Sequence, residues 1–222
     1  MTNHDAVLFD LDGVLVDSRV PFARAVNTAL ASQGLSPRPE HELHQYLGPP
    51  LHPTFQALVG KESLVQPCVD AYRVRYRELA ASQTTVFPGI RELLDELSDD
   101  LPLIIATSKP HALAEPLLDA LNLRRFFAAV VGPELDSENE QKTVTIGRAV
   151  REFTPESHPV MVGDRKHDIE AAHEHDIPAF GVLWGIGSED ELRTAGADAL
   201  VHTPAELTTL LTPARRARSR SA

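Results

Sequence analysis

Residues 8–18 read Leu8-Phe9-Asp10-Leu11-Asp12-Gly13-Val14-Leu15-Val16-Asp17-Ser18. This stretch begins at the end of a short apolar run and passes directly into carboxylates and a glycine. The apolar run has the length of a buried β-strand. Residues i and i+2 of an extended chain point to the same side, so we expect Asp10 and Asp12 to lie together at the carboxyl end of this strand. Gly13 allows a sharp turn immediately after them.

Further short apolar runs alternate with helical patterns along most of the chain. The predicted strands are Val7–Phe9, Leu103–Ala106, Ala128–Val131, Val160–Val162 and Ala179–Leu183, with Ala199–Val201 as one more. The predicted helices lie at about 88–98, 110–122, 141–153, 167–176, 188–195 and 204–212. This alternation is typical of a doubly wound, Rossmann-like α/β fold, in which helices cover both faces of a parallel sheet. Such sheets bind their ligands at the carboxyl ends of the strands.

One interval breaks the alternation. Between about Ser18 and Ser82 the pattern is helical, with candidate helices Arg24–Ser32, Glu42–Leu47, Thr54–Val59 and Leu64–Ala81. The interval is too long for one crossover connection, which favours an inserted all-helical cap domain over helices packed directly on the sheet. We therefore expect a catalytic core formed by residues 1–17 and 83–212 and a helical cap formed by residues 18–82.

Composition excludes several classes of protein. The formal net charge is -11, from 21 Lys+Arg and 32 Asp+Glu, so the overall field does not attract nucleic acid or an anionic membrane. The apolar runs are far shorter than the roughly 20 residues of a membrane helix, and Met1 to Asp5 do not resemble a signal peptide. Cys68 is the only cysteine and has no internal disulfide partner, which fits the cytoplasm.

The tail 213–222 carries four arginines and no acid. A solvated, disordered end is the simpler interpretation, and a contact with an acidic surface or nucleic acid is the alternative.

A second pair of carboxylates follows another predicted strand. Asp164 comes directly after the run Pro159–Val162, and Asp168 lies four residues later, where it could alternatively cap the following helix. Together with Asp10 and Asp12, this pair would place four carboxylates at one sheet edge. Such a cluster needs a cation to offset the repulsion, and Mg²⁺ suits carboxylate ligands.

Other polar residues lie where they could bind an anion. Thr107 and Ser108 follow the strand Leu103–Ala106 and could hold an anionic oxygen or serve as an ordinary helix cap. Lys142 begins the helical segment 141–153. Lys109 is a possible second cation near the site, although a solvated helix start is the simpler interpretation.

The motifs together resemble the haloacid dehalogenase superfamily. The first, Asp-Leu-Asp-Gly-Val-Leu-Val-Asp-Ser at 10–18, is highly specific to that superfamily, and the other three follow in its order. Within it, the chain is similar to the phosphoglycolate-phosphatase-like group. That similarity lies in Tyr46-Leu47-Gly48-Pro49-Pro50-Leu51, Phe87-Pro88-Gly89 and Gly181-Val182-Leu183-Trp184-Gly185-Ile186-Gly187-Ser188. Gly163-Asp164-Arg165-Lys166-His167-Asp168 is similar to a branch often labelled 5′-nucleotidase.

The resemblance implies a catalytic role for each acid. Asp10 would be the nucleophile that forms an aspartyl-phosphate, and Asp12 would protonate the leaving oxygen and then activate water. Mg²⁺ would bind the Asp10 carboxylate, the Asp12 backbone carbonyl and Asp164. Asp168 would support the metal, either as a ligand itself or through contacts with the residues that are ligands.

The resemblance also implies the residues that bind the substrate. Thr107 and Lys142 would hold phosphoryl oxygens of a small phosphorylated metabolite, with Ser108 beside them. We also expect the cap loop that contains Gly48 and Pro49 to contact the rest of the substrate, with a plain helix connector as the alternative. The acid at Asp12 favours a phosphatase over a dehalogenase. A phosphosugar mutase and a catalytically idle binding protein remain alternatives. The sequence does not distinguish a monomer from a homodimer.

Overall fold

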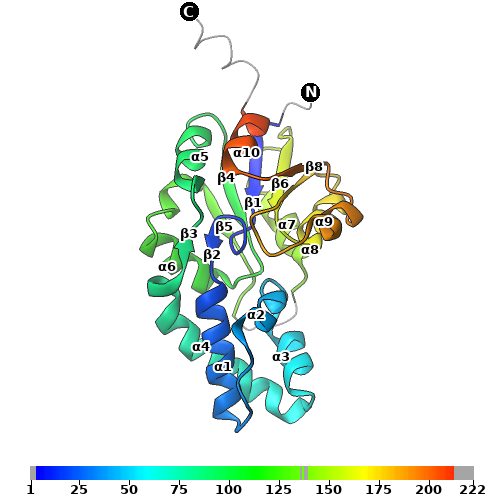
Figure 1. Cartoon of the computed structure of the whole chain (residues 1–222). Helices are drawn as coiled ribbons and strands as arrows, with labels where there is room; N and C mark the ends of the chain where they lie inside the picture. Colours follow the sequence, from blue (N-terminus) through cyan, green and yellow to red (C-terminus); the bar gives the residue numbers. More distant parts are fainter. Residues whose placement is uncertain (1–3, 136, 138–139, 213–222) are drawn as a thin grey trace, which may run out of the picture.

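In the computed structural model, which describes residues 4–135, 137 and 140–212, the chain forms a sheet-containing part with a group of helices below it. Figure 1 shows the sheet and its covering helices above and α1 to α4 below. The expectation about residues 213–222 lies outside the described part.

A six-stranded parallel sheet forms the upper part. In spatial order its strands are β5 (Ala129–Val131), β4 (Leu103–Ala106), β1 (Ala6–Phe9), β6 (Pro159–Gly163), β7 (Ala179–Val182) and β8 (Ala199–Val201). The first strand lies between β4 and β6, which follow much later in the chain. This order confirms the predicted doubly wound α/β fold.

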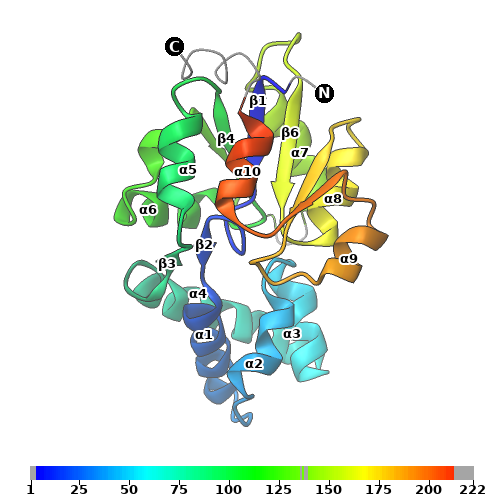
Figure 2. The ribbon, with the colours of Figure 1, turned by 45° about the horizontal axis from the view of Figure 1, so that its top comes forward.

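Alternate residues of the central strand enter different hydrophobic clusters. Val7 and Phe9 belong to the cluster that contains α5 (Ile90–Leu97), α6 (His111–Ala120) and α10 (Pro204–Leu211). Leu8 belongs to the cluster that contains α7 (Lys142–Val150), α8 (Lys166–His173) and α9 (Glu189–Thr194). Figure 2 shows these helices around the sheet. Burial on both faces explains why the strands are continuously apolar.

The short strands β2 (Val16–Asp17) and β3 (Thr85–Val86) form an antiparallel pair where the chain leaves and re-enters the upper part. The sequence analysis did not predict them, since two residues are too few to show a periodic pattern. The pairing of Val16 with Val86 brings together the two connections between the sheet and the helical segment.

The helical segment consists of α1 (Arg19–Ser32), α2 (Glu40–Leu43), the 3₁₀ helix η1 (His44–Tyr46), α3 (Leu51–Val59) and α4 (Glu62–Gln83). Helices α1 and α3 begin earlier than predicted because Pro21 and Pro53 lie in their first turns, where the missing N–H of proline breaks no intrahelical bond. Apolar residues of α1 and α4 pack together. None of the described helices is long and apolar enough to cross a membrane.

Candidate active site

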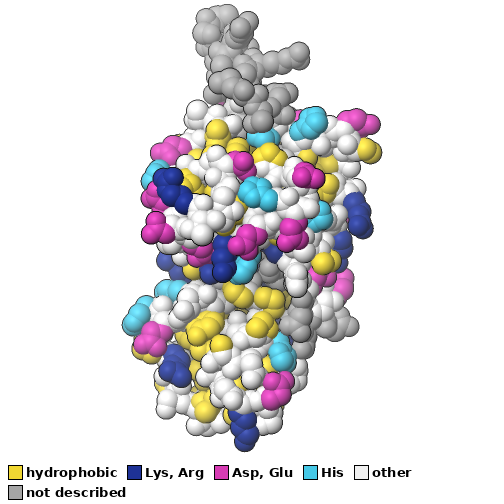
Figure 3. Space-filling model, turned by 90° about the vertical axis from the view of Figure 1, so that its right-hand side faces the viewer, with side chains coloured by type: hydrophobic (Ala, Val, Ile, Leu, Met, Phe, Trp, Pro, Cys, Tyr) yellow, Lys and Arg dark blue, Asp and Glu magenta, His cyan; other side chains and the backbone are white. Residues whose placement is uncertain are grey.

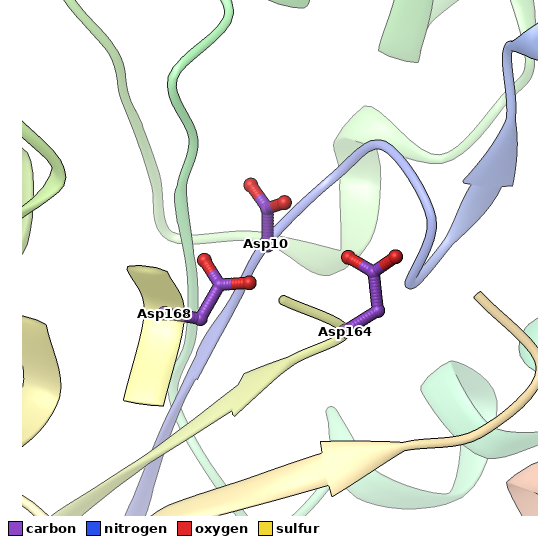
Figure 4. A group of neighbouring side chains, drawn as sticks. All are labelled: Asp10, Asp164 and Asp168. Atoms are coloured by element: carbon purple, nitrogen blue, oxygen red, sulfur yellow. The ribbon is translucent and has the colours of Figure 1, made fainter. Parts of the chain in front are cut away.

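Three carboxylates meet at the carboxyl edge of the sheet. Asp10 directly follows β1, Asp164 directly follows β6, and Asp168 lies in the first turn of α8. One oxygen from each lies within 4.8 Å of the others, and all three residues are buried. Figure 4 shows the carboxylates rising from these separate segments into one region. The sequence prediction that Asp10, Asp164 and Asp168 come together therefore agrees with the structure.

Asp164 is fully buried in a pocket built by glycines. A Cβ on Gly13 or Gly185 would come within 2.2 Å or 2.4 Å of Asp164 Oδ2, so only glycine permits this close approach. The Ile186 N–H donates to Oδ2 at 2.7 Å, whereas Oδ1 has no hydrogen-bond partner among the described residues. Burial, followed by the charges of Asp168 and Asp10, raises the pKa of Asp164 well above its ordinary value. An unpartnered buried carboxylate oxygen among other carboxylates fits a hard divalent cation.

Lys142 joins two of the three acids. Its Nζ lies 2.8 Å from Asp10 Oδ1 and 2.8 Å from Asp168 Oδ1, and its side chain is 6% exposed. Burial alone would lower the pKa of Lys142, but the charges of Asp10 and Asp168 raise it above its ordinary value. Burial raises the pKa of Asp10 to about 6, against the opposing effect of Lys142. Lys142 is thus a buried cation that contacts Asp10 and Asp168.

Asp168 also caps its helix. Its Oδ2 accepts a hydrogen bond from the Arg165 N–H at 3.1 Å, as part of a capping box at the start of α8. Its Oδ1 meets Lys142. The two interpretations of this residue, helix cap and member of the acidic cluster, are both true because its two oxygens point to different partners.

The Asp12 carboxylate is not a member of this group of three and contacts other side chains. Ser18 Oγ donates to its Oδ1, and Lys109 Nζ lies 2.8 Å from its Oδ2. The expectation of four carboxylates in one group is wrong, since the described residues gather only three. The i, i+2 argument failed because β1 ends at Phe9 and the chain then turns, so Asp10 and Asp12 do not share a strand.

Lys109 is buried beside Asp12, although a solvated helix start was the simpler interpretation of its sequence position. Its side chain is 8% exposed, and its Nζ contacts Asp12 and the hydroxyl of Tyr76 at 2.6 Å. Its position directly after Thr107 and Ser108, at the end of a predicted strand, was the available signal. The partner on α4 could not be predicted, because it comes from the inserted helical segment.

Thr107 and Ser108 lie at the end of β4, and neither caps α6, whose N-cap residue is Pro110. The Thr107 hydroxyl accepts from the Lys109 N–H at 3.1 Å. Both residues line the cavity that also contains Asp10 and Asp12. They are therefore placed beside the acids rather than used to begin the helix.

That cavity lies between the sheet edge and the helical segment. The helical segment contributes aromatic and loop residues to its wall: Phe22, Gly48, Pro49, Tyr72 and Tyr76. The loop 48–50 also lines a neighbouring cavity that contains Asp10 and Lys142. Figure 3 shows hydrophobic side chains gathered on the lower part of the molecule, just beneath the waist between the two parts.

Polar contacts connect the helical segment to the sheet-containing part. Arg165, just before α8, donates from Nη1 to the Leu47 carbonyl at 3.1 Å and forms an ion pair with Glu191 at 2.9 Å. Arg73 on α4 donates to the Leu135 carbonyl at 2.6 Å. The contact with Leu47 lies directly before the loop 48–50, which lines a cavity together with Asp10.

Several known proteins are similar in sequence. A 5′-nucleotidase from Pseudomonas aeruginosa is 37% identical over 190 residues, which are 84% of this chain and 86% of that protein. A phosphoglycolate phosphatase from Chromobacterium violaceum is 33% identical, with 93% and 96% of the two chains covered. The tyrosine-protein kinase PtkA of Mycobacterium tuberculosis is also 33% identical, over 88% of this chain and 68% of that protein.

The structural comparison and the family model agree with these similarities. The crystal structure of a predicted phosphatase from Clostridium acetobutylicum has a TM-score of 0.88 and 31% identity, and the match covers 95% of this chain and 99% of that one. The model of the haloacid dehalogenase-like hydrolase family matches residues 7–182. The chain therefore belongs to the haloacid dehalogenase-like hydrolase family and is a phosphatase, as the sequence predicted.

Proposed function

We propose that this protein is a Mg²⁺-dependent phosphomonoester hydrolase that acts on a small phosphorylated metabolite through an aspartyl-phosphate at Asp10. The observation that carries the proposal is the buried group of Asp10, Asp164 and Asp168, with Lys142 bridging two of its members. In this account residues 1–17 and 83–212 form the catalytic core, and residues 18–82 form the cap.

Mg²⁺ would be held by Asp10, Asp164 and the backbone carbonyl of Asp12, with Asp168 in support. The glycine-walled Asp164 and its unpartnered Oδ1 support this assignment. When bound, the ion supplies positive charge that offsets the repulsion between the carboxylates and an incoming phosphate.

Asp10 attacks the phosphorus in the first step. A bond forms between its carboxylate oxygen and phosphorus, while the bond from phosphorus to the leaving oxygen breaks. Asp12 donates a proton to that oxygen, so an alcohol leaves. In the second step Asp12 takes a proton from water, whose oxygen attacks phosphorus and releases phosphate from Asp10.

Residues around the nucleophile bind the phosphoryl group. Lys142 lies on Asp10 Oδ1 and can share its positive charge with a phosphoryl oxygen. Thr107 and Ser108 line the same cavity and supply hydroxyl and N–H donors. Gly48 and Pro49 of the cap contact the rest of the substrate, and the cap excludes bulk water.

The names of the relatives suggest phosphoglycolate and nucleoside monophosphates as the first substrates to test. The experiment is a panel of phosphorylated metabolites assayed for free phosphate with Mg²⁺, with Asp10→Asn as the inactive control. Sugar phosphates are examined in parallel for isomerisation and a tyrosine-containing protein for phosphorylation. Steady release of phosphate by the wild type alone supports hydrolysis. Isomerisation or transfer to protein without release of phosphate contradicts it.

A further inference from the structure

Lys109 has no part in the mechanism described above, yet its side chain is buried next to Asp12. It comes from the loop after β4, and its Nζ lies 2.8 Å from Asp12 Oδ2 and 2.6 Å from the Tyr76 hydroxyl. The same Nζ lies 4.5 Å from the centre of the Tyr76 ring. Tyr76 belongs to α4, so this lysine connects an acid of the core with the helical cap.

Both oxygens of the Asp12 carboxylate are held by side chains. Ser18, just before α1, donates to Oδ1, and Lys109 meets Oδ2. An ammonium group loses hydration when it is buried, and such burial is tolerated when charged and polar partners replace the water. The partners of Lys109 are Asp12 and Tyr76, so its charge is directed at the acid rather than at solvent.

We propose that Lys109 is a positioning residue for Asp12, and that Tyr76 ties this positioning to the contact between cap and core. The inference rests on the proposed function. When Asp12 gives its proton to the leaving oxygen, it becomes a carboxylate. Lys109 holds this carboxylate at a fixed place and neutralises its charge. Without Lys109, Ser18 is the one side chain of residues 4–135, 137 and 140–212 with a described contact to the Asp12 carboxylate, and the proton donor no longer faces the leaving oxygen reliably.

The need for a proton donor depends on the leaving group, which provides a selective test. A small alkyl phosphate expels an unstable alkoxide unless the leaving oxygen receives a proton, whereas 4-nitrophenyl phosphate expels a stable phenolate. We expect Lys109→Met to reduce kcat/KM for the alkyl phosphate about 10- to 100-fold more than for 4-nitrophenyl phosphate. The ratio kcat/KM is used because it reports the steps up to formation of the aspartyl-phosphate.

Two further variants separate positioning from folding. Lys109→Arg keeps a positive charge and N–H donors, so it should restore part of the activity on the alkyl phosphate. Tyr76→Phe keeps the buried ring and removes only the hydroxyl, so it should shift the ratio between the two substrates in the same direction by a smaller factor. Tyr72→Phe is the matched control, because Tyr72 stacks on Tyr76 at 5.4 Å and lines the same cavity. The hydroxyl of Tyr72 is not among the contacts described for Lys109. Tyr72→Phe therefore measures how far loss of a hydroxyl from the cavity wall shifts the ratio by itself, and Tyr76→Phe should shift the ratio further.

Circular dichroism and thermal melting accompany each variant. Equal losses on both substrates in Lys109→Met would overturn the proposal, since they indicate a structural or phosphate-binding role. Unchanged kinetics in folded Lys109→Met would overturn it as well. If Lys109→Met does not fold, Tyr76→Phe provides the test. A ratio of kcat/KM between the two substrates that is the same in Tyr76→Phe and in Tyr72→Phe would then refute the proposal. A wild type that hydrolyses neither substrate contradicts the proposed function itself.

Discussion

Replacing Lys142 with methionine tests the electrostatic arrangement of the site through stability rather than activity. Lys142 Nζ lies 2.8 Å from one oxygen of Asp10 and 2.8 Å from one oxygen of Asp168, and its side chain is 6% exposed. Methionine fills similar space and removes the charge, so buried carboxylates lose their cation. Breaking a buried ion pair by removing one partner costs about 3–5 kcal/mol. For a chain of this length, that corresponds to a fall in Tm of roughly 6–20 °C.

The assay is thermal and urea unfolding, followed by circular dichroism, first with a chelator and then with Mg²⁺. In the proposed account the lysine and Mg²⁺ would both offset the charge of the same acidic group, so Mg²⁺ should bind the variant more tightly and stabilise it more. A ligand present at 100 times its Kd stabilises the wild type by about 2.7 kcal/mol. The stabilisation of Lys142→Met at the same Mg²⁺ concentration should exceed the stabilisation of the wild type.

Lys166 offers a matched control, because it is the first residue of α8 as Lys142 is of α7, but it is exposed. Lys166→Met should change the free energy of unfolding by no more than about 0.5 kcal/mol. A loss below about 1 kcal/mol in Lys142→Met, or one equal to that of the control, would refute the argument that this lysine balances a buried acidic cluster.

Four further predictions concern the nucleophile, its titration, the metal pocket and the cap. Asp10→Asn should fold, but its rate of phosphate release should fall at least roughly a thousandfold, which corresponds to about 4 kcal/mol of transition-state stabilisation. If the variant retained a tenth of the rate, water would attack the substrate directly. Folding raises the pKa of Asp10 from 3.8 to about 6, so between pH 3.8 and pH 6 the folded metal-free protein binds more protons than the unfolded protein does. Its free energy of unfolding should therefore rise by about 1 kcal/mol from pH 7 to pH 5 through this residue, and melting in chelator should show a smaller rise for Asp10→Asn. Gly185→Ala places a Cβ 2.4 Å from Asp164 Oδ2 and should therefore weaken the binding of Mg²⁺, which calorimetry measures. An unchanged affinity for Mg²⁺ would contradict this expectation. Replacing Pro49 and Pro50 with alanine should change the ratio of kcat/KM among phosphorylated substrates; a uniform fall would make the loop structural.

The sheet could be predicted from the sequence because its strands are buried on both faces. Each predicted strand ends within one residue of the observed one, as for Leu103–Ala106 and Ala199–Val201. The two-residue strands at Val16 and Thr85 were missed because their pairing is long-range and carries no local pattern. Helix α1 begins at Arg19, five residues before the predicted start, and Pro21 lies in its first turn, where a proline breaks no intrahelical hydrogen bond.

The acids of the site could be predicted from their position after strands, but their orientation could not. Asp10 and Asp164 directly follow β1 and β6, which are neighbours in the sheet, so topology brings them together. Asp12 lies beyond the end of β1, and its direction depends on Ser18 and Lys109, which belong to other segments. The contact between Asp12 and Lys109 joins distant parts of the chain, so local sequence patterns do not reveal it.

The central claim is that the phosphoryl group is carried on the enzyme before it reaches water. Hydrolysis in isotopically labelled water of a phosphorothioate monoester, made chiral at phosphorus by its sulfur and by oxygen isotopes, tests this claim most directly, because the outcome does not require the intermediate to accumulate. Two successive in-line displacements, first by Asp10 and then by water, predict retention of configuration at phosphorus. Inversion would mean a single attack by water and would contradict the nucleophilic role of Asp10.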